Sequence, residues 1–435
     1  MFIQKKHSSL TQNPYFLFFP FFLLYAIFIF LISKKILIGD EVRYLFFAKN
    51  LTHGYYWHPD DPIGLGNGPG YPIALVPFVA FNLPLIYIKV LNAFFQYLSI
   101  VFLFKSLREI VSYKKALIIS LSWACYYNVL DFIYLVYAES ISIFLVSLLL
   151  FFLVRTFRQT NLKADKYLYL SGITMGYLAL TKVIFGYVML FMLAGSILLW
   201  LAKRHHMNYR KSLIILSLAF ATTLPYLVYT YSLTNRMFYW TTNSGDNLYW
   251  MTSLHKDEYG STFSFSDFEI QSPGYEATSW FGKDSIKSHH QKDYEEIRKY
   301  PDMMTKDSIL KKIAVSNIRS KPAKFLQNCF SNIGRMLFNY PYSYSFQKPS
   351  NLFRLPLNGI MVVLMLFCVV PTIINWRGIV YPLRFLLIFV FLYFGGSILG
   401  SAETRMFTVA VPILLFWIAY IIQKTIRVNL RFTKP

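Results

Sequence analysis

Charged residues are scarce in this sequence. Only 15% of its 435 residues are Asp, Glu, Lys or Arg, whereas a soluble globular domain carries about 25%. Hydrophobic residues make up 55% of the chain and aromatic residues 19%, with a mean hydropathy of +0.42. So much apolar surface excludes both a soluble globular protein and a disordered chain, and it predicts an integral membrane protein.

Acidic residues are the scarcer of the two charged kinds. The chain has 21 Asp and Glu against 43 Lys and Arg, which gives a net charge of +22. In a soluble chain such an excess would indicate nucleic-acid binding. In a membrane protein it is expected as the cytoplasmic excess of Lys and Arg that fixes orientation and contacts anionic lipid. We therefore predict membrane lipids, and not nucleic acid, as partners.

Cysteines and the motifs of common enzyme classes are also lacking. The three cysteines, Cys125, Cys329 and Cys368, form no C-x-x-C pair, which argues against a disulfide framework or a structural zinc site. No G-x-S-x-G, H-E-x-x-H, P-loop or dinucleotide-binding glycine motif occurs in a suitable context. The common hydrolase, zinc-protease and nucleotide-binding classes therefore find no support.

Long apolar runs, in contrast, are abundant, and a spanning helix needs about 20 such residues. The first run, 15–33, has no small-residue cleavage site after it, so we expect an uncleaved span. Further runs lie near 84–104, 115–130, 137–154, 167–181, 183–201, 212–232, 356–375, 379–399 and 406–423. The sequence predicts an all-α polytopic membrane protein with about ten transmembrane helices, of which 115–130 and 167–181 are the shortest.

Basic residues gather in alternate loops, at 105–115, 155–166, 203–211, 377 and 424–431. These loops fall on the same side as the N-terminus, which is therefore predicted to be cytoplasmic. The opposite side receives the loop 34–83, the segment 233–355 and three short turns. Arg43 is one of the basic residues that violate this bias in the first outer loop, which indicates a function there unless the topology is wrong.

The segment 233–355 is polar and too long to be a simple connection, so we expect a small extracytoplasmic domain. It separates an N-terminal transmembrane catalytic module, 1–232, from C-terminal transmembrane helices in 356–435. Its later part, about 305–338, carries apolar residues every four positions after Pro322. That pattern fits an amphipathic helix in the membrane interface, and it fits a helix packed on the domain's own core equally well.

Two adjacent carboxylates, Asp40 and Glu41, directly follow the first apolar run. At a membrane boundary they cost desolvation free energy unless they are paired or used. One explanation is a helix cap formed by Gly39 and Asp40. The other is a general base near the bilayer surface, where a lipid-linked substrate would present its head group.

Further ionisable residues lie at the predicted outer ends of spans. Singly, such residues are often anchors that extend to the interface. Together they place carboxylates and cations on one side, and a phosphate-bearing substrate needs cations at the phosphate and a base at the attacking hydroxyl. These residues are Asp131, Glu139, Lys182, Glu403 and Arg405.

The order of these features resembles the GT-C superfamily of membrane glycosyltransferases. The stretches that carry the resemblance read GDEVRYLFFAKNLTHG, GPGYP, LVYAESISIFL, GYLALTK and SAETRMFTVAVPILL. Within the superfamily, the chain looks most like protein O-mannosyltransferases, lipid A aminoarabinose transferases and RgtA/B/C/D-like bacterial relatives. Specific similarity is confined to these stretches, and the acidic pair is the most specific of them.

The resemblance implies an inverting transfer of a sugar from a polyprenyl-phosphate carrier to a lipid, glycan or protein acceptor, outside the cytoplasmic (inner) membrane of a bacterium, as in lipopolysaccharide assembly. It implies that Asp40 is the catalytic base and Glu41 its companion. The residues expected at the donor phosphate are Lys182, Arg405 and Arg43. The residues expected at the substrate or acceptor are Glu139, Glu403, Tyr71 and Asp131.

A glycosyl phosphate has a leaving group that needs little protonation, so one base suffices. The resemblance implies no metal cofactor. A divalent cation at His58, Asp60 and Asp61 is the alternative, and a solvated turn explains these three residues better.

Two other functions remain open. A polymerase or ligase of envelope polysaccharide would also be polytopic, but the acidic pair directly after the first span speaks against it. A flippase or transporter of lipid-linked sugars would place ionisable residues in the middle of spans, whereas here they cluster at the ends. The sequence does not identify the sugar or the acceptor.

Overall fold

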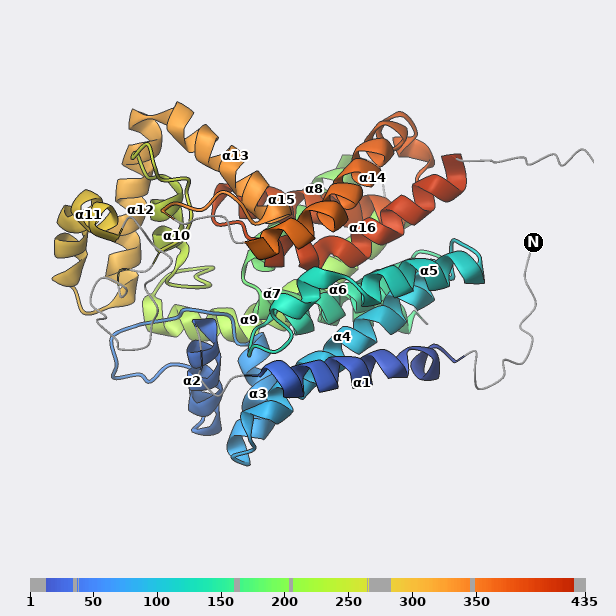
Figure 1. Cartoon of the computed structure of the whole chain (residues 1–435), viewed down its shortest axis with the longest axis horizontal. Helices are drawn as coiled ribbons and strands as arrows, with labels where there is room; N and C mark the ends of the chain where they lie inside the picture. Colours follow the sequence, from blue (N-terminus) through green and yellow to red (C-terminus); the bar gives the residue numbers. More distant parts are fainter. Residues whose placement is uncertain are drawn as a thin grey trace, which may run out of the picture.

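The computed structural model describes residues 13–33, 37, 39–159, 165–202, 206–263, 265, 283–344 and 349–425. These residues form helices joined by loops, with no strand among them, which confirms the predicted all-α class (Figure 1). In the first half of the chain the helices are α1 (Pro14–Ile32), α2 (Asp40–Thr52), α3 (Gly70–Ala80), α4 (Leu85–Leu107), α5 (Tyr113–Ala124), η2 (Tyr127–Asp131), α6 (Glu139–Thr156), α7 (Lys166–Thr181), α8 (Ile184–Ala202) and α9 (Met207–Thr234).

The second half of the chain begins with three helices at the left end of the molecule in Figure 1 and a fourth that runs from there to the long helices, and three long apolar helices follow. They are α10 (Ser244–Met251), α11 (Lys283–Arg298), α12 (Met303–Ser320), α13 (Pro322–Phe338), η5 (Pro349–Phe353), α14 (Arg354–Ile374), η6 (Trp376–Gly378), α15 (Tyr381–Leu399) and α16 (Thr404–Thr425).

Eight described helices are long and apolar enough to cross a membrane: α1, α4, α6, α8, α9, α14 extended by η5, α15 and α16. About ten were expected. The difference lies in the two shortest predicted spans, which form α5 with 12 residues and α7 with 16. At about 1.5 Å per residue, neither spans a hydrocarbon core about 30 Å thick on its own.

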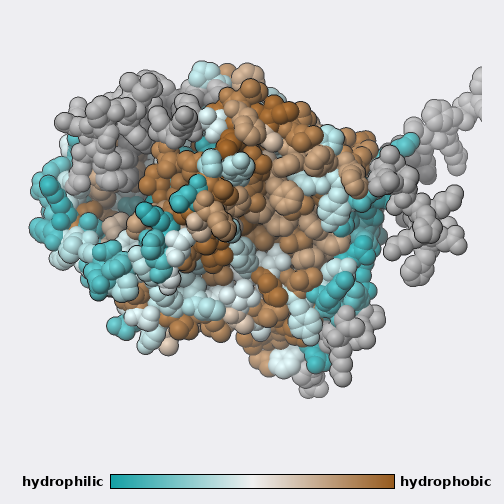
Figure 2. Space-filling view, turned by 90° about the horizontal axis from the view of Figure 1, so that it is seen from below, coloured by the Kyte–Doolittle hydropathy of each residue, from teal (hydrophilic) through white to brown (hydrophobic). Residues whose placement is uncertain are grey.

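The bundle is ordered from a buried centre to an apolar outside. α6 and α16 are mostly buried, and α6 packs against α4, α7 and α16. α1 and α14 are mostly exposed, and they present large apolar side chains such as Leu31, Phe367 and Ile374. Figure 2 shows apolar residues across the middle of one face and hydrophilic residues at both ends. Such a surface belongs to an integral membrane protein, because lipid covers the apolar band.

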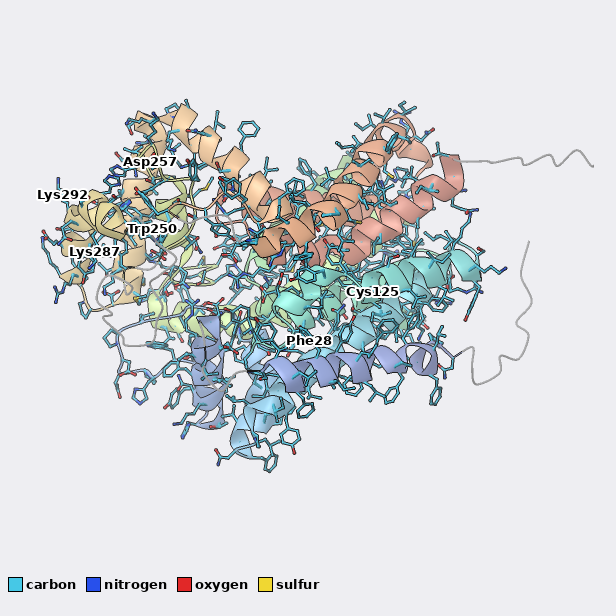
Figure 3. The ribbon with its side chains drawn as sticks, in the orientation of Figure 1. Phe28, Cys125, Trp250, Asp257, Lys287 and Lys292 are labelled. Carbon is cyan, nitrogen blue, oxygen red and sulfur yellow. The ribbon has the colours of Figure 1, made fainter. Side chains whose placement is uncertain are left out.

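A second, smaller core lies in the unit formed by α10 to α13. Its buried members include Trp250, Ile286, Ile297 and Leu310. In Figure 3, Trp250 lies within this unit at the left, whereas Phe28 and Cys125 lie among the long helices. The flanking helices α9 and α14 end and begin close to the predicted bounds of 233–355. The side of the membrane on which the unit lies stays a prediction.

The single helix expected over about 305–338 is in fact two helices. The break falls at Lys321, whose φ and ψ of −137° and 69° are non-helical, because the residue before a proline is disfavoured in the helical conformation. The amphipathic pattern of α13 also has an unexpected orientation. Its polar residues Asn328, Asn332 and Arg335 are buried, whereas Leu326 and Phe330 are exposed.

Hydrogen bonds explain this orientation of α13. Asn328 Nδ2 donates to the carbonyl of Met251 over 3.0 Å, and Arg335 donates to the carbonyls of Tyr259 and Gly260 over 3.0 and 2.9 Å. The polar face therefore satisfies the backbone of the segment that follows α10. The apolar residues Leu326 and Phe330 are left on the surface, and an interfacial position of α13 stays a prediction.

Candidate functional site

Asp40 is the first residue of α2 and does not cap it. The cap position belongs to Gly39, which has a φ of +58° and makes no side-chain cap hydrogen bond. A Cβ at Gly39 would also lie 3.2 Å from the hydroxyl oxygen of Tyr137, so both the backbone angle and the space favour glycine. The Asp40 carboxylate is instead paired with Arg43, one turn later, and with Arg405 of α16. The structure thus removes the capping explanation.

Six ionisable side chains gather here, and we call them the charged cluster: Asp40, Arg43, Glu139, Lys182, Glu403 and Arg405. Arg405 Nη1 lies 3.1 Å from Asp40 Oδ2 and 3.7 Å from Glu139 Oε1, and Arg405 Nε lies 2.7 Å from Glu403 Oε2. Lys182 Nζ donates to Glu139 Oε1 over 2.8 Å. Six residues that are up to 365 positions apart in the sequence therefore form one continuous chain of ion pairs.

Helix ends bring the cluster together. Glu139 is the first residue of α6, Arg405 the second of α16, and Lys182 directly follows α7. With α2, the N-termini of three helices point to one place. The first-turn N–H groups and the dipoles of these helices favour a negative charge there.

The cluster is graded from a buried end to an open end. The side chain of Glu139 is 3% exposed, that of Asp40 19% and that of Arg43 47%. Glu139 Oε2 is buried and has no hydrogen-bond partner among the described residues. Burial alone would raise the pKa of Asp40, but the charges of Arg405 and Arg43 outweigh it and lower the pKa to about 2.

Glu41 points away from its neighbour Asp40, because successive residues of a helix face different directions. It is fully buried, and its Oε1 accepts a hydrogen bond of 2.7 Å from the backbone N–H of Val136. That contact fixes the segment before α6, where the ring of Tyr137 lies 5.6 Å from the guanidinium of Arg405. Glu41 thus supports the cluster from behind, and its catalytic role stays a prediction.

The GPGYP stretch joins the first outer loop to the end of α7. A Cβ at Gly68 or Gly70 would lie 2.1 Å or 2.5 Å from atoms of Leu180 and Thr181, so only glycine permits this approach. Tyr71 is fully buried, and its hydroxyl donates to Asn92 Oδ1 over 3.0 Å. The stretch therefore packs directly before Lys182, with Tyr71 in the protein interior.

Other predicted residues lie outside the cluster. Asp131 pairs with Arg354 over 2.8 Å. Asp60 is almost fully exposed, and its carboxylate lies 4.0 Å from His58. In the part of the chain that the structure describes, no three His, Cys, Asp or Glu residues are grouped so that they could hold a metal ion. Acceptor binding by Asp131 and metal dependence both stay predictions.

The structure adds residues that the sequence did not indicate. Tyr137 lies over Arg405, and Tyr44 is buried one turn after Asp40. Gly66 lies against Arg43, because a Cβ at Gly66 would be 3.6 Å from Arg43 Cδ. The only available signal was that Tyr137 stands two positions before Glu139 in a stretch already singled out.

Among the solved structures that this chain is similar to are two membrane glycosyltransferases of the GT-C superfamily. One is ArnT, the lipid A aminoarabinose transferase of Cupriavidus metallidurans, bound to undecaprenyl phosphate. The match has 12% sequence identity and a TM-score of 0.42, and it includes 95% of this chain and 78% of ArnT. The apo state of ArnT gives the same values.

Another is the Archaeoglobus fulgidus oligosaccharyltransferase tethered to an acceptor peptide with the NVT sequon, with 12% identity and a TM-score of 0.49. The match includes 95% of this chain and 50% of the oligosaccharyltransferase. This chain therefore spans about half of the length of that enzyme. No protein-family model and no curated protein sequence matches the chain. At 12% identity these similarities are distant.

Proposed function

We propose that this protein is a membrane glycosyltransferase that transfers a sugar from a polyprenyl-phosphate carrier to an acceptor on the extracytoplasmic face, with Asp40 as the general base. The observation that carries the proposal is the charged cluster at the ends of apolar helices. It offers two partly exposed carboxylates, Asp40 and Glu403, with three cations and three helix N-termini at one place. A lipid-linked phosphate needs cations, and its reaction with a hydroxyl needs one base.

At the anomeric carbon the reaction forms one bond and breaks one. The acceptor oxygen attacks the anomeric carbon from the face opposite the phosphate, Asp40 takes the acceptor's proton, and the bond from the anomeric carbon to the phosphate oxygen breaks. Arg405, Arg43 and Lys182 hold the departing phosphate. A buried acceptor oxygen such as Glu139 Oε2 can take a hydrogen bond from a sugar hydroxyl.

Donor binding and basicity are coupled in this arrangement. With both arginines on Asp40, the carboxylate is a weak base, because its pKa lies at about 2. A phosphate that draws Arg405 and Arg43 toward itself removes these cations from Asp40 and raises the pKa of the carboxyl. The base is therefore strengthened when the donor is present, and water is not activated in its absence.

The test replaces Asp40 by Asn, which is nearly isosteric. The purified protein is reconstituted in vesicles with a sugar linked to undecaprenyl phosphate and a membrane extract as the source of acceptor. We expect the rate at which sugar transfer frees undecaprenyl phosphate to fall by at least about 10²-fold, while the temperature of thermal unfolding stays unchanged. Asp257→Asn, at an exposed aspartate of the α10–α13 unit, is the matched control. Near wild-type release by Asp40→Asn would exclude Asp40 as the base.

A further inference from the structure

A cavity of about 230 Å³ lies between α10 and α12 in the α10–α13 unit. Residues of α11 line it as well. Its polar and charged lining residues are Thr242, Asn243, Asp246, Tyr294, Arg298, Lys306 and Asp307, and its apolar ones are Phe265, Ile297, Met303 and Leu310. Sites for drug-sized ligands are usually larger, at about 300–1,000 Å³. The cavity therefore has room for one small ring and not for an extended chain.

The loop 63–67 connects this cavity to the charged cluster. The backbone N–H of Thr242 donates to the carbonyl of Leu65 over 2.7 Å, and Asn243 Nδ2 donates to the carbonyl of Gly66 over 3.0 Å. The side chain of Arg43 also packs against Gly66, because a Cβ added to Gly66 would lie 3.6 Å from Arg43 Cδ. A single loop thus touches both the lining of the cavity and the arginine that pairs with Asp40.

Two polar groups of the lining are ready for a hydroxyl ligand. Thr242 is 3% exposed, and its hydroxyl has no hydrogen-bond partner among the described residues. Asp246 Oδ1 accepts from Trp250 Nε1 over 3.1 Å. Burial raises the pKa of Asp246 to about 7, so that near neutral pH this carboxyl both donates and accepts hydrogen bonds.

We propose that this cavity binds a sugar ring of the acceptor, so that the acceptor is a glycan or a glycolipid head group and not a peptide. The inference rests on the proposed function. A sugar ring presents hydroxyl groups to the threonine, amide and carboxyl groups, and its C–H face to the apolar lining. The donor's sugar does not compete for this place, because it is bonded directly to the phosphate and must lie at the cations of the charged cluster.

The test measures binding of free methyl glycosides of glucose, mannose and galactose to the full-length protein in nanodiscs by saturation-transfer NMR. The variants are Asp246→Asn and Thr242→Val, with Asp257→Asn as the matched control. We expect binding of at least one glycoside to the wild type and to the control, and an affinity at least tenfold lower in both cavity variants that still unfold at the wild-type temperature. Absence of binding to the wild type, or equal binding in all variants, would overturn the proposal.

A parallel titration with undecaprenyl phosphate separates this proposal from the proposed function. If the carrier binds and the glycosides do not, the cavity is not a sugar site, and the proposed function stands. If the glycosides bind and the carrier does not, the acceptor assignment is overturned together with the proposed function. Tighter binding of the NVT tripeptide than of any glycoside, lost in Asp246→Asn, would make the acceptor a peptide and overturn the proposal.

Discussion

Two of the networks of ionisable groups among the described residues differ in how completely they are closed. In the charged cluster, ion pairs run from the buried Glu139 to the half-exposed Arg43, and one oxygen of Glu139 has no hydrogen-bond partner among the described residues. The cations there can turn from a carboxylate to a phosphate, because the cluster is open at Arg43 and Asp40.

The second network lies in the α10–α13 unit and is centred on Glu258. Its carboxylate contacts His290 Nε2 at 2.9 Å, His289 Nδ1 at 3.1 Å and the hydroxyl of Tyr344 at 3.2 Å. The hydroxyl of Tyr249 lies 2.5 Å from the other ring nitrogen of His290. These bonds tie α10, α11 and the segment after α13 together. A closed network of this kind stabilises a fold, whereas an open one can bind a ligand.

The largest expected effect concerns the open network. Arg405→Ala and Lys182→Ala each remove a cation that we place at the donor phosphate. Loss of one charge-assisted hydrogen bond costs about 1.5–3 kcal/mol, so affinity for undecaprenyl phosphate should fall about 10- to 150-fold. The measurement is carrier binding to the reconstituted protein. The control is Arg319→Ala, at an exposed arginine of α12. Unchanged carrier affinity in both cluster variants would mean that Lys182 and Arg405 do not bind the phosphate and only anchor their helices at the membrane interface.

The next effect concerns the closed network. Glu258→Gln removes the charge that His289 and His290 face, and we expect the free energy of unfolding to fall by about 1.5–3 kcal/mol, while carrier affinity of the folded protein stays at the wild-type value. Thermal unfolding and carrier binding on the same sample check both parts. Glu295→Gln, at an exposed glutamate of α11, should change stability by less than about 0.5 kcal/mol. A loss of carrier affinity in Glu258→Gln would contradict the division between the networks.

A smaller effect follows from pH. Burial would raise the pKa of Glu258, but the hydrogen bonds and charge of His290 outweigh it and lower the pKa to about 2. A carboxyl whose pKa is lower in the folded state contributes stability above its unfolded pKa of about 4.3, and that stability is lost as pH falls toward 2. The difference in unfolding temperature between wild type and Glu258→Gln should therefore shrink between about pH 5 and pH 3. A difference that stays constant over this range would contradict the low pKa.

The smallest change, a single Ser→Cys substitution, tests whether the α10–α13 unit lies on the extracytoplasmic side of the membrane. Ser288→Cys and Ser112→Cys replace exposed serines in a background in which the exposed Cys125 is Ser. We expect an impermeant thiol reagent to label Ser288→Cys from outside in cells with an intact inner membrane, and Ser112→Cys only after that membrane is permeabilised. The reverse pattern would place the unit, and the charged cluster beside it, in the cytoplasm.

Hydropathy was enough to predict most of the cluster. Glu139, Lys182 and Arg405 lie at the ends of long apolar helices, and the alternation of loops places such ends on one side. The divergence of Asp40 and Glu41 was not predictable, because it depends on where α2 begins. A start at Asp40 directs one carboxylate to Arg405 and the other to the backbone of Val136.

Contacts between distant parts of the chain explain what the sequence did not reveal. The cavity lining meets the loop 63–67 across more than 170 positions, and no local pattern marks that pairing. The sequence indicated an amphipathic helix in α13 but not the burial of Asn328 and Asn332, which donate to carbonyls that only the folded chain brings near. Eight described helices have the length of a full span, because the two shortest predicted spans form the short helices α5 and α7.

The equal numbers of cations and carboxylates in the charged cluster have a consequence for product release. Three positive and three negative side chains sum to zero, so a donor diester with one negative charge brings the filled site to −1. In the proposed reaction the phosphate becomes a dianion while Asp40 gains the proton, and the sum is still −1. The chemical step therefore creates no net charge in a poorly solvated place, where charge is costly. The imbalance arises only afterwards, when Asp40 returns its proton to water and regains its charge beside a dianion, and this repulsion drives the spent carrier out of the site.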